Sequence, residues 1–286
     1  MADLPIGVHP RRGVAGATRA GHPLSRRRAA APAALAATGF TAMFLSVVVL
    51  LPIAALLATG LGPGFVEAVT TPQALAALAF TVAVSLVATG IDVVAGLAVA
   101  WVLVRDDFPG RRFVDALIDL PFALPTIVAG LTLLALYGQD SPIGLDLAYT
   151  RPGVALALLF VTVPFVVRAL QPVLLELDGD AEEAAATLGA SPWTTFRRII
   201  LPALRLPLVV GGAQAFARCL GEFGSVVLIS GNLPFRTEVA AVVVAGQIEN
   251  GDAQAAAAIA VVLLGAALVV VVVVRSLASR RVRSAR

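Results

Sequence analysis

Long apolar stretches alternate with short polar segments along most of the 286-residue chain. A helix needs about 20 apolar residues to cross a hydrocarbon core of roughly 30 Å, and its backbone hydrogen bonds must be satisfied internally. Prolines interrupt two of the stretches, but helices buried among other helices tolerate such breaks. The pattern therefore predicts an all-α polytopic membrane protein with six transmembrane helices, at residues 38–60, 78–104, 117–137, 154–175, 206–230 and 253–274.

Composition and charge agree with this pattern and predict an orientation. Hydrophobic residues make up 59% of the chain and charged residues only 14%, which is unlike a soluble domain. Cytoplasmic loops retain positive charge during membrane insertion, and only Arg151 and Arg236 lie in the opposite loops. Both termini are thus predicted to be cytoplasmic, and the net charge of +3 indicates orientation rather than nucleic-acid binding. The arginines on the predicted cytoplasmic side are Arg26, Arg27, Arg28, Arg105, Arg111, Arg112, Arg197, Arg198, Arg205, Arg275, Arg280, Arg281, Arg283 and Arg286.

The chain divides into a central membrane domain and two basic ends. Residues 1–37 are rich in Arg, Ala, Gly and Pro without periodicity, and we expect a mobile cytoplasmic tail there. Residues 38–276 are the predicted transmembrane domain, and residues 277–286 a second basic cytoplasmic tail. The single cysteine, Cys219, suits a packing role within the fifth span. His9 and His22 both lie in the first tail, so the sequence predicts no metal site.

Several enzyme classes are excluded by residues that the chain lacks. All 21 basic residues are arginines, so there is neither a phosphate-binding loop lysine nor a Schiff-base lysine. The HExxH and GxSxG motifs of hydrolases are also missing, and the deep carboxylate Asp92 has no obvious catalytic partner. A structural membrane protein or a simple channel would have the same hydropathy. The polar loop between the fourth and fifth spans is therefore the segment that can distinguish these classes from others.

That loop, residues 182–202, reads EEAAATLGASPWTTFRRIILP and predicts two short helices. Acidic residues crowd the start of the first, where the helix dipole favours them, and alanines follow. Gly189 can give this helix a left-handed ending, and Ser191 before Pro192 can cap the second. Residues 193–200 have an apolar face, which taken alone fits an ordinary interfacial helix equally well. Pro202 then permits a turn into the fifth span.

The spacing within this loop resembles a known signature. Glu183, Ala184 and Ala185 are followed by three residues and Gly189, then by nine residues and Ile199, then by one residue, Leu201 and Pro202. This resembles the EAA loop of binding-protein-dependent ABC importer permeases, with every fixed position filled. The resemblance implies a cytoplasmic coupling helix within residues 178–202 that docks on a separate ATPase. The implied coupling residues are Glu182, Glu183, Ala184, Ala185, Gly189, Ile199, Leu201 and Pro202.

Further segments are similar to the T-type permease subunit of bacterial sulfate/thiosulfate ABC importers: LPFALPTIVAGLTL (120–133), VPFVVRALQPVLLEL (163–177), LGEFGSVVLISGN (220–232) and RTEVAA (236–241). Molybdate/tungstate permeases are the alternative, since they are similar around GEFG. The resemblance implies a multi-pass protein of the bacterial cytoplasmic membrane that works with two ATPase subunits, a second homologous permease and an extracytoplasmic sulfate-binding protein. The chain itself would contact lipid, hold no cofactor and catalyse no reaction, because ATP and Mg²⁺ belong to the ATPase.

An isolated charged side chain at the middle of a membrane helix costs on the order of 3 kcal/mol of insertion free energy. Charged residues within the predicted spans should therefore have a structural partner or a function. Arg168, near the end of the fourth span, can extend to the interface. Arg218 and Glu222 are four residues apart and can form an ion pair, or can serve with Gln214 as a waypoint for the transported anion. Asp92 and Arg218 each lie thirteen residues inside a boundary arginine, so we also hypothesise an Asp92–Arg218 pair between neighbouring helices.

Overall fold

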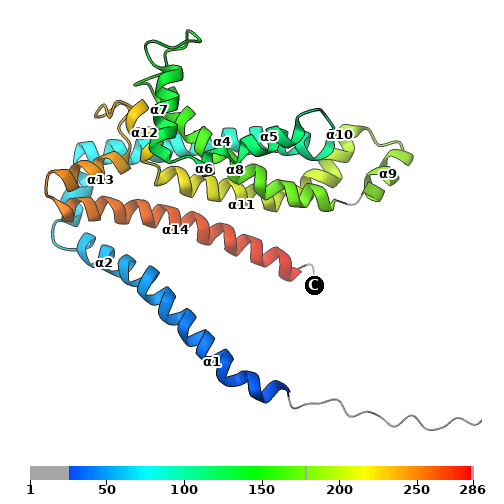
Figure 1. The fold of residues 1–286 in the computed structure, drawn as a ribbon, viewed down its shortest axis with the longest axis horizontal. Coiled ribbons are helices and arrows are strands. Elements are labelled where there is room, and N and C mark those ends of the chain that lie inside the picture. The colour runs from blue at the N-terminus through cyan, green and yellow to red at the C-terminus, as the bar shows by residue number, and fades with distance from the viewer. Residues whose placement is uncertain (1–25, 178, 285–286) are drawn as a thin grey trace, which may run out of the picture. The chain divides into compact units, whose positions relative to one another are not determined.

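The computed structural model describes residues 26–177 and 179–284, and every regular element within these ranges is a helix (Figure 1). The prediction of an all-α protein is therefore confirmed. Five helical segments of the described chain are long and apolar enough to cross a membrane: Ala34–Gly60, Pro72–Arg105, Arg151–Glu176, Pro192–Leu220 and Ala253–Val274.

The chain forms two compact units that divide between residues 53 and 54. The first contains α1 (Arg26–Leu45), the π-helical turn η1 (Ser46–Leu50) and the start of α2 (Leu51–Gly60). Its helix begins at Arg26 rather than at residue 38, so the predicted tail is partly helical. Residues 1–25 of that tail lie outside the described residues. Side chains 34–52 are all exposed, which suits a helix in contact with lipid or with another subunit.

The second unit is built around three mutually packed helices, α4 (Pro72–Arg105), α8 (Arg151–Glu176) and α11 (Leu201–Leu220) (Figure 1). Small residues allow these helices to approach closely. A Cβ added at Gly96 of α4 would lie 2.8 Å from the Val166 side chain, and one at Gly211 of α11 would lie 3.0 Å from the Val166 Cα. Such close contacts supply the van der Waals packing that holds membrane helices together. α14 (Ala253–Ser284) packs beside α11.

The predicted third span, residues 117–137, is divided among α5 (Arg111–Ile118), α6 (Leu120–Ala123) and α7 (Thr126–Tyr137). Pro125 is the cause: a residue before proline is driven out of the helical region, and Leu124 is extended, with φ −86° and ψ 136°. At 1.5 Å per residue, α7 alone is only about 18 Å long.

The predicted fifth span is broken too. α11 ends at Leu220, and α12 (Gly224–Ile229) continues after a non-helical link. α12 packs against α7, so the two broken helices meet. Two further helices were not predicted, α3 (Phe65–Thr70) and α13 (Ala240–Glu249). α13 follows from the apolar run AAVVVAGQIE, which is too short to indicate a membrane span.

Candidate functional site

The loop after α8 folds as the capping residues predict. α9 (Gly179–Thr187) has Asp180 and Glu182 in its first turn. Gly189 has a φ of +79°, and the amide of Ala190 donates to the Ala185 carbonyl at 3.0 Å, which completes a left-handed helix ending. The side chain of Ser191 then accepts a hydrogen bond from the Thr194 amide and caps α10 (Pro192–Thr195).

Pro202 does not form a turn, because α10, the π-helical turn η2 (Phe196–Ile200) and α11 form one unbroken helical segment. Each π-helical turn of the described chain ends two residues before a proline, η1 before Pro52 and η2 before Pro202. A proline ring within an α-helix clashes with the carbonyl four residues earlier, and the wider π turn relieves that crowding. The loop after Gly189 is therefore rigidly continuous with α11.

The outer surface of this loop is open. No residue of α9 is buried, and the side chains of Leu188 and Trp193 are 88% and 67% exposed. Glu183 and Ala184 are exposed as well, whereas Ile199 and Leu201 are half-buried against the helices. Exposed apolar side chains beside a helix that buries nothing are typical of a surface that meets another protein.

The opposite side of the loop contacts the end of α4. Arg105 Nη2 lies 2.5 Å from Glu182 Oε1, and the guanidinium carbon lies 5.4 Å from the centre of the Trp101 ring. The Trp101 ring in turn meets Phe196 edge-to-face, with centroids 5.6 Å apart. We call these four residues the α4 clasp: Arg105, Trp101, Glu182 and Phe196. Sequence reasoning missed this clasp, because nothing in the spacing relates residue 105 to residue 182.

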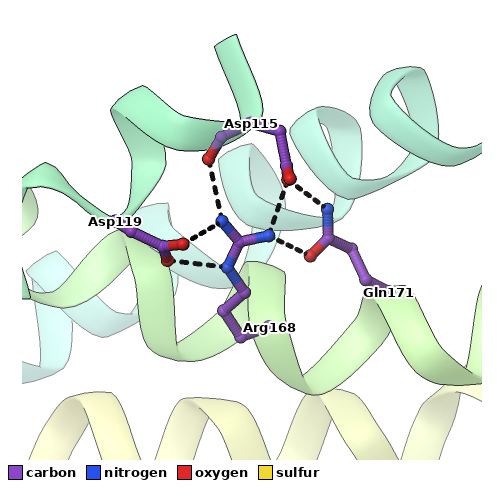
Figure 2. Close-up of polar contacts among 4 residues, drawn as sticks. All are labelled: Asp115, Asp119, Arg168 and Gln171. Carbon is purple, nitrogen blue, oxygen red and sulfur yellow. Dashed lines mark hydrogen bonds and ion pairs between the residues drawn. The ribbon is translucent and has the colours of Figure 1, made fainter. Parts of the chain in front are cut away.

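The Arg168 side chain extends from α8 to Asp115, Asp119 and Gln171, and these four residues form the Arg168 cluster (Figure 2). Its guanidinium makes five hydrogen bonds at 2.5–2.8 Å: two to the Asp119 carboxylate, one each to the Asp115 carboxylate and carbonyl, and one to Gln171. All five N–H donors are used. Bonds from Gln171 and from Arg168 lower the pKa of Asp115 below its ordinary value. Arg168 thus joins α8 to α5 and has no donor left for a substrate.

Arg218 and Glu222 form an ion pair where α11 ends, with Arg218 Nη1 2.5 Å from Glu222 Oε2. Glu222 is buried, and its other oxygen accepts a hydrogen bond from the Ser225 amide at 2.9 Å, which caps α12. A cavity of about 370 Å³ lies beside this pair, between the breaks that precede α7 and α12. Gln214, one turn before Arg218, is exposed, and no hydrogen bond within the described chain involves its side chain.

The hypothesised Asp92–Arg218 pair is not formed. Although α4 and α11 are neighbours, Arg218 pairs with Glu222, while Asp92 Oδ2 lies 2.6 Å from Thr162 Oγ1 on α8. Thr162 Oγ1 is also 2.7 Å from the Leu158 carbonyl. The Thr162 hydroxyl has one proton, so Asp92 and the Leu158 carbonyl compete for it, while the Cys219 thiol donates to the same oxygen at 3.7 Å. Among the residues with described placement, no group of three His, Cys, Asp or Glu could hold a metal ion.

A helical bundle with five segments long and apolar enough to cross a membrane, within the described residues, defines a multi-pass membrane protein. Residues 92–284 match the family described as "Binding-protein-dependent transport system inner membrane component", and the chain belongs to this family. It is accordingly a transport subunit of the inner membrane and not itself an enzyme.

Curated relatives are similar over most of the chain. The "Probable sulfate transport system permease protein cysT" of Nephroselmis olivacea is 47% identical over 230 residues, which cover 77% of this chain and 81% of the relative. The "Sulfate transport system permease protein CysT" of Escherichia coli (strain K12) is 43% identical over 228 residues, covering 76% and 82%.

Solved structures share the fold. A bacterial ABC transporter involved in the import of the acidic polysaccharide alginate superposes with a TM-score of 0.72 at 16% identity, over 89% of this chain and 98% of that one. The MetNI methionine ABC transporter in an inward-facing conformation gives a TM-score of 0.53 at 18% identity, over 75% and 96%. The fold is thus that of an ABC transporter permease.

Proposed function

We propose that this chain is a permease subunit of an ATP-driven importer that moves sulfate and thiosulfate across the cytoplasmic membrane. The observation that carries the proposal is the identity of 43–47%, over three quarters of the chain, to proteins named as sulfate transport permeases. Molybdate or tungstate is the alternative substrate, and the names of these relatives do not favour it.

The orientation follows from the arginines that flank the helices. With α6 and α7 together forming a sixth crossing, both termini and the 182–202 loop lie on the arginine-rich side, which is the cytoplasmic side. Partners then meet the chain on both faces. Two ATPase subunits with ATP and Mg²⁺ bind in the cytoplasm, an extracytoplasmic binding protein delivers the anion, and a second permease subunit completes the pathway.

The 182–202 loop is the coupling site in this proposal. Leu188 and Trp193 provide exposed apolar contacts for a groove on the ATPase, and the acidic start of α9 adds charge. Because the helix runs without a turn from Pro192 through α11, displacement of the loop moves α11 with it. ATP-driven approach of the two ATPase subunits then switches the spans between inward-facing and outward-facing states.

The anion pathway is proposed along the α11 face that carries Gln214 and Arg218. Both side chains are accessible in this subunit, and an unpartnered polar group in a membrane helix must face water or another protein rather than lipid. Glu222 neutralises Arg218 at 2.5 Å, so a passing dianion is attracted without being held tightly. The cavity beside the pair gives space for it.

Uptake measurements in a strain that lacks this chain test the substrate. Labelled sulfate uptake should be lost, and the gene for the wild-type chain should restore it, with thiosulfate competing for uptake. Molybdate uptake is measured in parallel. Unchanged sulfate uptake together with lost molybdate uptake would assign the chain to the alternative substrate.

A matched pair of glycine variants tests the coupling site. Gly189 and Gly110 both have left-handed backbones, with φ of +79° and +88°, and among the described residues, chain neighbours aside, no atom lies within 4 Å of a Cβ added at either. Gly189→Glu places bulk and charge on the proposed docking surface, so ATPase co-purification and uptake should both fall. Gly110→Glu carries the same backbone strain outside the loop and should retain both. Equal behaviour of the two variants would refute the docking assignment.

A further inference from the structure

The α4 clasp links the 182–202 loop to a helix that is remote from it in the sequence. Arg105 lies at the last residue of α4 and Glu182 in the first turn of α9, 77 residues later. Trp101, one turn before Arg105, meets Phe196 in the second half of the loop. Both halves of the loop are therefore attached to the end of one helix.

The ion pair within the clasp is more enclosed than a typical surface pair. The side chains of Arg105 and Glu182 are 26% and 24% exposed, whereas Asp107, the partner of the nearby Arg111, is 98% exposed. Trp101 covers the guanidinium of Arg105, and a cation over an aromatic ring is stabilised further when water is excluded. Since α9 buries no residue, polar contacts rather than packing fix its position, and the bond to Arg105 joins it directly to α4.

α4 is well placed to carry a displacement into the membrane. It is 34 residues long, it packs against both α8 and α11, and it contains the buried Asp92. A rigid helix transmits a push along its axis without bending, so movement of its end moves its contacts at mid-membrane. The loop is covalently continuous only with α8 and α11, and the clasp adds a third helix.

We propose that Arg105 is a positioning residue that transmits movement of the 182–202 loop to α4 through Glu182. When the ATPase draws the loop toward the partner subunit, α4 moves with the loop because the α4 clasp keeps α9 attached to the end of α4. Without the clasp, α9 moves while α4 stays behind, and ATP is hydrolysed with little transport. This inference rests on the proposed function, in which an ATPase binds the loop.

The test uses the complete complex of this chain, its partner permease, the ATPase and the binding protein, reconstituted in proteoliposomes. Three quantities are measured: ATPase co-purification, ATP hydrolysis, and sulfate transported per ATP hydrolysed. Arg105→Gln removes the charge at the end of α4 and leaves the side chains of the 182–202 loop unchanged. It should retain co-purification and hydrolysis while the sulfate-to-ATP ratio falls by about fivefold or more, the low end of coupling between distant sites. Glu182→Gln should lower the ratio by a similar factor.

Reversing both charges of the Arg105–Glu182 pair tests whether the pair transmits movement or whether each residue has only a structural role of its own. The double variant Arg105→Glu with Glu182→Arg restores an ion pair of opposite polarity, and the sulfate-to-ATP ratio should recover to at least about half of the wild-type value. Arg111→Gln removes a neighbouring, exposed ion pair and should leave the ratio unchanged.

The outcomes distinguish the inference from the proposed function. If the wild-type chain does not co-purify with the ATPase, or if the complex transports no sulfate, the proposed function fails. If the wild-type complex transports sulfate and Arg105→Gln retains the full ratio, the inference is overturned. The inference is also overturned if the sulfate-to-ATP ratio of the double variant is no higher than that of either single variant.

Discussion

Replacing Arg168 with glutamine should destabilise the protein by an amount that follows from the bonds of the Arg168 cluster. Asp115 and Asp119 are 44% and 51% exposed at their side chains, so water partly replaces the lost guanidinium. Ion pairs of this exposure each contribute up to about 1 kcal/mol. The bonds to the Asp115 carbonyl and to Gln171 add about 1 kcal/mol together. The expected loss is therefore about 2–3 kcal/mol in the free energy of unfolding.

The assay is thermal unfolding of the purified protein in detergent, followed by tryptophan fluorescence at a fixed scan rate. A loss of this size corresponds to a fall in Tm of about 5–10 °C for a chain of this length. Arg111→Gln is the control, because its partner Asp107 is 98% exposed and the pair contributes less than about 0.5 kcal/mol. Equal Tm shifts for the two variants would refute the argument that enclosure of the guanidinium sets the contribution.

The pH dependence provides a second check on the same cluster. The folded pKa of Asp115 lies below its ordinary value of 3.8, so its stabilising contribution is complete above that value. The contribution is lost as the pH falls through the lowered folded pKa. The difference in Tm between wild type and Arg168→Gln should therefore stay constant from about pH 5 to 8 and shrink below about pH 4. A difference that changed between pH 5 and 8 would contradict the assignment.

Two further substitutions test close packing and the buried bonds. In Gly130→Ala the new Cβ would lie 2.7 Å from the carbonyl oxygen of Ser225, so we expect a loss of about 1–3 kcal/mol in thermal unfolding and none for Gly265→Ala, where nothing lies within 4 Å. Asp92→Asn supplies a neutral donor and should retain sulfate uptake, whereas Thr162→Val removes the shared hydroxyl and should lower stability by about 1–3 kcal/mol. Loss of uptake in Asp92→Asn, with normal expression, would show that the carboxylate charge itself is required.

The sequence predicts the elements that depend on local chemistry. The helix ending at Gly189 and the cap at Ser191 follow from backbone preferences that act within a few residues. The helix break at Leu124 could also have been predicted, because Pro125 follows it. Reading the segment by its average hydropathy hides the effect of this single proline. Local sequence signals thus predict where a helix ends better than they predict whether a long apolar segment forms one unbroken helix.

The partners of buried charges depend instead on how helices rotate about their axes. Equal depth placed Asp92 and Arg218 at the same level of the membrane, yet Asp92 contacts Thr162 on α8 rather than α11. Rotation is set by the contacts of many small residues, such as Gly96 and Gly211 against Val166, and no single spacing reveals it. The α4 clasp could not be predicted for the same reason.

The two helix breaks have a mechanical consequence. α7 and α12 pack against each other, and a Cβ added at Gly224 would collide with Thr126, so the contact is close. Each helix joins the bundle through a non-helical link, at Leu124 and Pro125 for α7 and at residues 221–223 for α12. Rotation of the pair at these two short links would break no internal helical hydrogen bond, but Val226 and Ile229 of α12 would have to slide against the α8 residue Leu158 in the same buried core.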